Sequence, residues 1–167
     1  MSKSRNAQIS AEYVKLRGEL WPGVKEEDLW PRAKQIGFVM IPRTMPLILR
    51  IMDHMAKGKP VSRAYLEVWC RAHNECVVKL EKHAQMAFYA GYSGQRRVQS
   101  WQARLRTLDK LGFISIKDGS NGPFSFALIL NPHAVIKRHH KAGTGGVPKG
   151  LYNALMERGV EVKAKDL

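Results

Sequence analysis

One stretch of the sequence combines cationic and amide side chains at the spacing of a helix. Residues 93–117 contain six Lys or Arg and a single acidic residue, Asp109. In a DNA major groove arginine bonds bidentately to guanine and glutamine to adenine, and each pair contributes ~1–3 kcal/mol of discrimination. These residue types therefore indicate nucleic-acid recognition. The candidate contacts are Ser93, Gln95, Arg96, Arg97, Gln99, Ser100, Ala103, Arg104, Arg106, Lys110 and Lys117.

A helix from about Gln95 to Lys110 would divide these residues between two faces. At ~100° per residue one stripe is apolar and can be buried against the domain: Val98, Trp101, Leu105 and Leu108. On the other side we predict that Arg96, Gln99 and Ser100 read bases and that Ala103 allows close approach to a base step. The remaining cations of the helix are predicted to hold phosphates: Arg97, Arg104, Arg106 and Lys110.

Turn signals bound this helix at both ends. A helix predicted from residue 81 or 82 to Ala90 leads into the turn Gly91–Gly94, where Ser93 is the expected N-cap and would face a phosphate. Gly112 is the expected C-terminal stop. Strands are predicted over residues 113–117 and 124–130, on either side of a dense turn signal, DGSNGP. Lys117 lies near the tip beside Asp118, so we expect the hairpin to bind weakly.

Helix, turn, long helix and hairpin follow in this order over residues 81–130, which resembles a winged helix-turn-helix domain. The likeness lies in HAQMAFYAGYSGQRRVQSWQARLRTLDKLGFISIK, above all in the glycine that ends the long helix and leads into the first wing strand. It implies an α+β, mainly helical fold with a C-terminal β-hairpin wing, extra helices at both ends, and duplex DNA as partner. IGFVMIPR before an apolar helix is loosely similar to the N-terminal domains of plasmid and phage replication initiators, which implies a role in replication or transcription control.

The overall charge agrees with a polyanionic partner. The chain of 167 residues has 28 Lys and Arg against 14 Asp and Glu, giving a net charge of +14. A polyanion relieves the self-repulsion of such an excess and releases condensed counterions. DNA, RNA and anionic lipid would each serve as such a polyanion. Duplex DNA binding has three alternatives. The basic face is only solvated, or the chain binds RNA, or the winged helix docks a protein partner.

Three parts are predicted along the chain: a helical extension over residues 1–35, the winged-helix domain over 36–142, and a flexible linker with a short helix over 143–167. The first nine residues are expected to be loose, with a helix from Ser10 and a short second helix after an acidic run, Glu26-Glu27-Asp28. Residues 36–41 (IGFVMI) are predicted as a strand. The other predicted elements are a helix from Pro46 to Met55, a helix capped by Ser62, a brief extended link at Val77-Val78, and a helix opened by Asn131-Pro132.

Two predicted helices have apolar stripes that would pack either within the chain or against another protein. The stripe Tyr13, Leu16 and Leu20 is expected to be core or the surface of a homodimer. The last helix, with Leu151 and Leu155, would dock on its own domain or recruit a replication or regulatory protein.

Catalysis and cofactors are not expected. Cys70, His73, Cys76 and His83 have the wrong spacing for a zinc site, and the adjacent His139 and His140 of KRHHK cannot face one metal ion. No phosphate loop or catalytic triad is recognisable. No stretch reaches the ~20 apolar residues of a membrane span and no apolar run follows the basic start, so we expect a cytoplasmic protein with reduced cysteines and no membrane partner.

Overall fold

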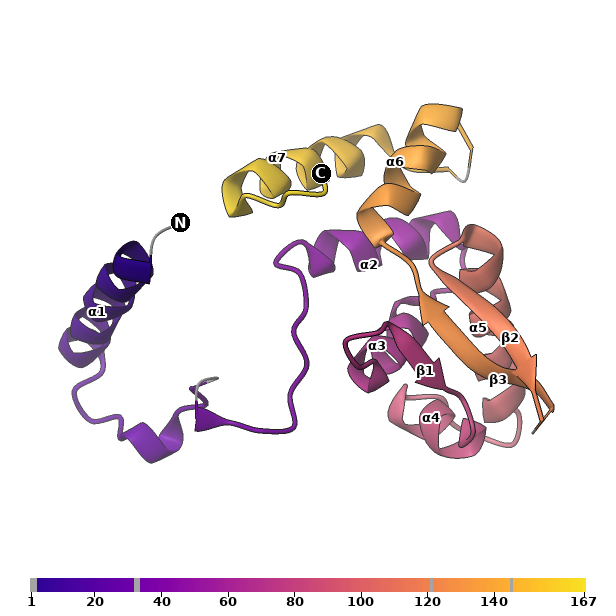
Figure 1. The fold of residues 1–167 in the computed structure, drawn as a ribbon, viewed down its shortest axis with the longest axis horizontal. Helices are drawn as coiled ribbons and strands as arrows, with labels where there is room; N and C mark the ends of the chain where they lie inside the picture. The colour runs from indigo at the N-terminus through magenta and orange to yellow at the C-terminus, as the bar shows by residue number, and fades with distance from the viewer. Residues whose placement is uncertain (1–2, 32–33, 121, 145) are drawn as a thin grey trace. The chain divides into compact units, whose positions relative to one another are not determined.

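The computed structural model describes residues 3–31, 34–120, 122–144 and 146–167 (Figure 1). They belong to two units, Met1–Phe38 and Val39–Leu167. In the Met1–Phe38 unit, α1 spans Lys3–Leu20 and one 3₁₀ turn, η1, spans Glu26–Asp28. The prediction that the helix begins at Ser10 is wrong, because the segment before it contains neither Gly nor Pro and continues the helix back to Lys3.

The Val39–Leu167 unit is α+β and mainly helical. Its elements in chain order are α2 (Met45–Met55), α3 (Ser62–Arg71), β1 (Val77–Lys79), α4 (His83–Tyr89), α5 (Arg97–Leu111), β2 (Ile114–Gly119), β3 (Gly122–Ile129), α6 (Pro132–Ala142) and α7 (Lys149–Val162). The helices predicted from Pro46, from about residue 82 and from Pro132 are confirmed to within a few residues.

A three-stranded antiparallel sheet has the order β1-β3-β2. Lys117 in β2 pairs with Phe126 in β3, and Val77 in β1 pairs with Leu128 on the other side of β3. The predicted hairpin of β2 and β3 is confirmed. Val77-Val78, expected only as an extended link, belongs to β1, which pairs with β3. The strand predicted over residues 36–41 is wrong, since the described residues of this segment pair with no strand and form none.

The core lies between the inner face of the sheet and the surrounding helices. Trp101, Leu105 and Leu108 on α5 are fully buried, as their spacing predicts, whereas Val98 is half-buried. Other elements contribute large buried side chains, among them Ile51 of α2, Tyr65 of α3, Met86 of α4, Phe113 and Ile114 at the start of β2, Ile136 of α6 and Leu155 of α7. α7 packs along α2, so the last helix is part of this unit.

Two of the predicted helix ends are confirmed and a third is wrong. Gly112 terminates α5 with a φ of 81°, which favours glycine. The Asn131 side chain accepts hydrogen bonds from the amides of His133 and Ala134 at the start of α6. Ser62 does not cap α3 as predicted, because it is the first residue of that helix and Asp53 of α2 accepts from its amide and hydroxyl.

Candidate nucleic-acid interface

A tight turn joins α4 to α5 and fixes the direction in which α5 leaves. Gly91 and Gly94 both have a φ of 77°, and the amide of Tyr92 donates to the carbonyl of Ala87. A guanidinium nitrogen of Arg63 donates to the carbonyl of Gly91 at 3.2 Å, and this guanidinium lies 5.2 Å from the centre of the Tyr92 ring. The turn is therefore held from α3 as well as from α4.

The start of α5 differs from the prediction. The helix begins at Arg97 with Arg96 as its N-cap, and no side chain caps it. Ser93 is not the N-cap, because the turn at Gly94 brings the Arg97 amide to the Gly94 carbonyl and delays the helix by two residues from Gln95. Ser93, Gln95 and Arg96 therefore lie in the turn before α5, with their side chains exposed.

All eleven predicted contact residues reach the surface of the Val39–Leu167 unit. Ten lie on α5 or on the turn before it, and Lys117 lies on β2. The exposed ones are Ser93, Gln95, Arg96, Arg97, Gln99, Arg106, Lys110 and Lys117. Ser100, Ala103 and Arg104 are half-buried. At ~100° per residue, Gln99, Ala103, Arg106 and Lys110 form one stripe opposite the buried face.

The cations on this surface are not neutralised by direct pairing. Within the described part of the chain, none of the six Lys and Arg of residues 93–117 forms an ion pair. The one acidic residue of α5, Asp109, accepts a hydrogen bond from the amide of Ile116 at 2.9 Å and so holds the start of β2. The surface therefore keeps its positive charge.

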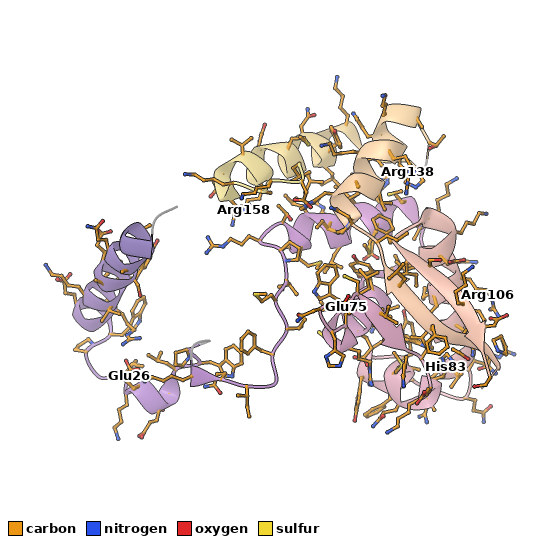
Figure 2. The ribbon with its side chains drawn as sticks, viewed as in Figure 1. Glu26, Glu75, His83, Arg106, Arg138 and Arg158 are labelled. Atoms are coloured by element: carbon orange, nitrogen blue, oxygen red, sulfur yellow. The ribbon has the colours of Figure 1, made fainter. Side chains whose placement is uncertain are left out.

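Two arginines of α5 contact different neighbouring elements. The Arg106 guanidinium lies 4.7 Å from the centre of the Phe124 ring on β3, on the hairpin side (Figure 2). Arg104 Nε donates to the carbonyl of Pro60 at 3.0 Å, on the side of the loop that precedes α3. These contacts connect α5 to an element on each side of it.

His83, the first residue of α4, contacts both α5 and β3, a role that the sequence did not indicate. Trp101 Nε1 of α5 donates to His83 Nδ1 at 3.2 Å, and the His83 ring meets the edge of Phe124 on β3 with ring centres 6.4 Å apart. Burial lowers the pKa of His83 below 6.5, against a smaller opposite effect from a hydrogen bond with the Phe124 backbone. The neutral ring is the form that can accept from Trp101.

The basic cluster KRHHK lies on α6, beyond the C-terminal end of α5. His139 Nε2 donates to the carbonyl of Leu111 at 2.8 Å, and His140 stacks on Tyr152 with ring centres 3.6 Å apart. Both histidines thus have packing roles. Lys137 is half-buried, and Arg138 and Lys141 are exposed.

A groove of about 500 Å³ lies away from α5, between Thr44, Trp69 and the C-terminal segment. It contains a hydroxyl–imidazole–carboxylate row: Thr44 Oγ1 is 2.7 Å from His133 Nε2, and His133 Nδ1 is 2.8 Å from Asp166 Oδ2. Thr44 and His133 are buried, and each polar group is already bonded to the next. The row therefore ties the C-terminal segment to the start of α6.

The described residues contain neither a cluster of metal ligands nor a helix that could cross a membrane. In the part of the chain that the structure describes, no three His, Cys, Asp or Glu side chains come together as a metal would require. Cys70 and Cys76 are exposed free thiols. No described helix has both the length and the apolar character to cross a bilayer.

Known proteins give no guide to this surface. Comparisons with protein-family models, with curated proteins and with solved structures found no match.

Proposed function

We propose that this chain is a winged-helix protein that binds duplex DNA, in replication or transcription control of a plasmid, phage or bacterial chromosome. α4, the turn at residues 91–96, α5 and the β2–β3 hairpin would be its helix-turn-helix and wing. The choice of process rests on the short likeness to replication initiators. The choice of partner rests on the surface of α5.

The observation that carries the proposal is a helix with one face in the core and an opposite face of unpaired cations and amides. α5 has 15 residues and is therefore about 22 Å long at ~1.5 Å per residue. A B-DNA major groove about 12 Å wide admits a helix of this kind. The proposed base contacts are Arg96, Gln99 and Ser100, with Ala103 small enough to let the helix approach.

The remaining residues of the surface would hold the sugar-phosphate backbone. Arg97, Arg106 and Lys110 point from α5 toward solvent, and Ser93 and Gln95 lie in the turn before it. Lys117 is the cation that the hairpin would bring to the DNA. Such contacts position a protein on the duplex without reading its sequence.

Titration of labelled duplex at several salt concentrations tests the proposal. Each neutralised phosphate should make log K fall with log[salt] by a slope of about −0.9. Selection of bound duplexes from a random pool should then yield a preferred sequence, and a structured RNA competitor should displace it poorly. Absence of duplex binding at low salt, or stronger competition by RNA, would overturn the proposal.

A protein-interaction adaptor is the second candidate, and the outer face of the sheet favours it. Three apolar side chains there are exposed: Val77 by 46%, Phe126 by 37% and Leu128 by 40%. An adaptor would form a salt-tolerant complex with an unrelated protein and would show no duplex affinity. The same salt series therefore separates the two functions.

A further inference from the structure

The loop between α2 and α3 has an unusual backbone and two exposed lysines. Lys57 has a φ of 49° and Gly58 a φ of 80°, so two successive residues adopt the left-handed conformation. For a lysine this conformation costs roughly 1 kcal/mol, which the surroundings must offset. The side chains of Lys57 and Lys59 are exposed, and neither forms an ion pair with a described residue.

Asp53 holds the end of this loop from α2. Its carboxylate accepts from the amides of Val61 at 2.6 Å and Ser62 at 2.7 Å, and from the Ser62 hydroxyl at 2.6 Å. Three donors on one carboxylate leave the chain at Val61 little freedom. The loop therefore has a fixed end at the start of α3.

Arg104 holds the loop against α5. The bond from its Nε to the carbonyl of Pro60 joins residues that are 44 apart in sequence. At ~100° per residue, Arg104 lies about 40° around α5 from Ser100, between the exposed stripe and the buried face. Lys57 and Lys59 precede Pro60 by three residues and one, so the Arg104 bond holds the chain next to them against this side of α5.

We propose that the Lys57–Pro60 loop is a second contact for the DNA backbone, in which Lys57 and Lys59 meet phosphates along the edge of the groove that α5 enters. Arg104 is then a positioning residue that orients the loop, rather than a phosphate contact as predicted from its spacing. This inference rests on the proposed function. A helix in the major groove has a phosphate strand on each side, and the loop would face one of them.

The test is a salt titration of the full chain with the double variant Lys57→Gln/Lys59→Gln. Loss of two phosphate contacts should make the slope of log K against log[salt] shallower by up to about 1.8. The ratio of affinities for a selected and a scrambled duplex should stay the same. The matched control is Lys163→Gln/Lys165→Gln, which removes the same charge at the same spacing, also from a left-handed lysine at 163 (φ of 56°).

A mutant cycle tests the role of Arg104. If Arg104 acts by placing the loop, Arg104→Gln should weaken binding markedly in the wild-type background and far less in the double variant, because neighbouring effects are then not additive. Additive losses would overturn the positioning role. Equal slope changes in the two lysine pairs, or none in the loop pair, would overturn the loop contact while the wild type still binds. Failure of the wild type to bind duplex would instead overturn the proposed function.

Discussion

Arg96 and Gln99 differ from Arg97 in where they lie around the recognition surface. At ~100° per residue, Arg96 lies about 60° from Gln99, whereas Arg97 lies about 160° away, on the same side of α5 as Arg104. We expect Arg96→Ala and Gln99→Ala each to reduce the preference for a selected over a scrambled duplex by ~1–3 kcal/mol. Arg97→Ala should weaken both duplexes alike. Equal losses on both duplexes for all three variants would refute this assignment of roles.

His83 should make the fold sensitive to mild acid. Its folded pKa lies below 6.5, so the unfolded chain takes up this proton first as pH falls. The contribution of His83 is therefore fully present above the unfolded pKa, and the free energy of unfolding decreases as pH falls from about 6.5 toward the folded pKa. Denaturation at several pH values should show this decrease in the wild type.

His83→Gln is the matching variant, because it keeps a polar side chain near Trp101 but does not titrate. The pH dependence of the wild type minus that of His83→Gln should isolate this residue from the other histidines. An NMR titration of the His83 ring measures its pKa in the folded protein directly. A folded pKa above 6.5 would contradict the prediction.

At the scale of elements, the turn before α5 offers two glycines that separate strain from contact. Gly91 and Gly94 share a φ of 77°, but only at Gly91 would a Cβ meet a side chain, the Arg63 guanidinium at 2.9 Å. Gly94→Ala should cost roughly 1 kcal/mol, from the left-handed backbone alone. Gly91→Ala should cost more, because Arg63 must also leave the Gly91 carbonyl. Urea denaturation measures both, and equal losses would show that the Arg63 contact contributes nothing.

The C-terminal segment gives a prediction about α6 and α7. Burial alone would raise the pKa of Asp166, but hydrogen bonds with His133 and Asn131 outweigh this and hold it below 3.8. Asp166→Ala leaves the buried His133 without a partner at Nδ1, and we expect a loss of about 1–3 kcal/mol in unfolding free energy. Lys165→Ala, an exposed neighbour, is the control and should change little. The idea fails if both variants unfold alike.

Elements with local signals could be predicted from the sequence. Gly112 ends α5 and Asn131 caps α6 because in each case one residue satisfies the helix end by itself. The apolar stripe of α5 is likewise local, because it follows from helical spacing alone. β1 is only three residues long and depends on β3, which lies about 50 residues away, so its pattern was too short to identify as a strand. The prediction for residues 36–41 was wrong for the same reason, since these residues are strand-like but pair with no strand in the described part of the chain.

The candidate surface also combines features that the sequence predicts with features that it does not. The exposed stripe of α5 followed from helical periodicity. The contacts of Arg104 with Pro60 and of His83 with Trp101 cross between elements and left no mark in the local pattern. Ser93 was misplaced because the spacing of the turn glycines, rather than the presence of a serine, decides where α5 begins.

At the scale of the whole molecule, the Met1–Phe38 unit leaves a question of assembly. Within that unit Tyr13, Leu16 and Leu20 on α1 are exposed by 68%, 45% and 56%. A palindromic sequence among selected duplexes would favour a homodimer, since two-fold proteins bind two half-sites about one helical turn apart. Sedimentation of the free protein at several concentrations gives an independent measurement.

The register of the hairpin has a consequence for changes in its length. Lys117–Phe126 is a pair on the outer face, while Ala127 and Ile129 point into the core. Shifting one strand by a single residue would exchange these sets, so an insertion within either strand is disruptive. The tip between Gly119 and Gly122 lies outside that restriction. Residues added there would lengthen the reach of the hairpin without changing the pairing that packs the sheet against the core.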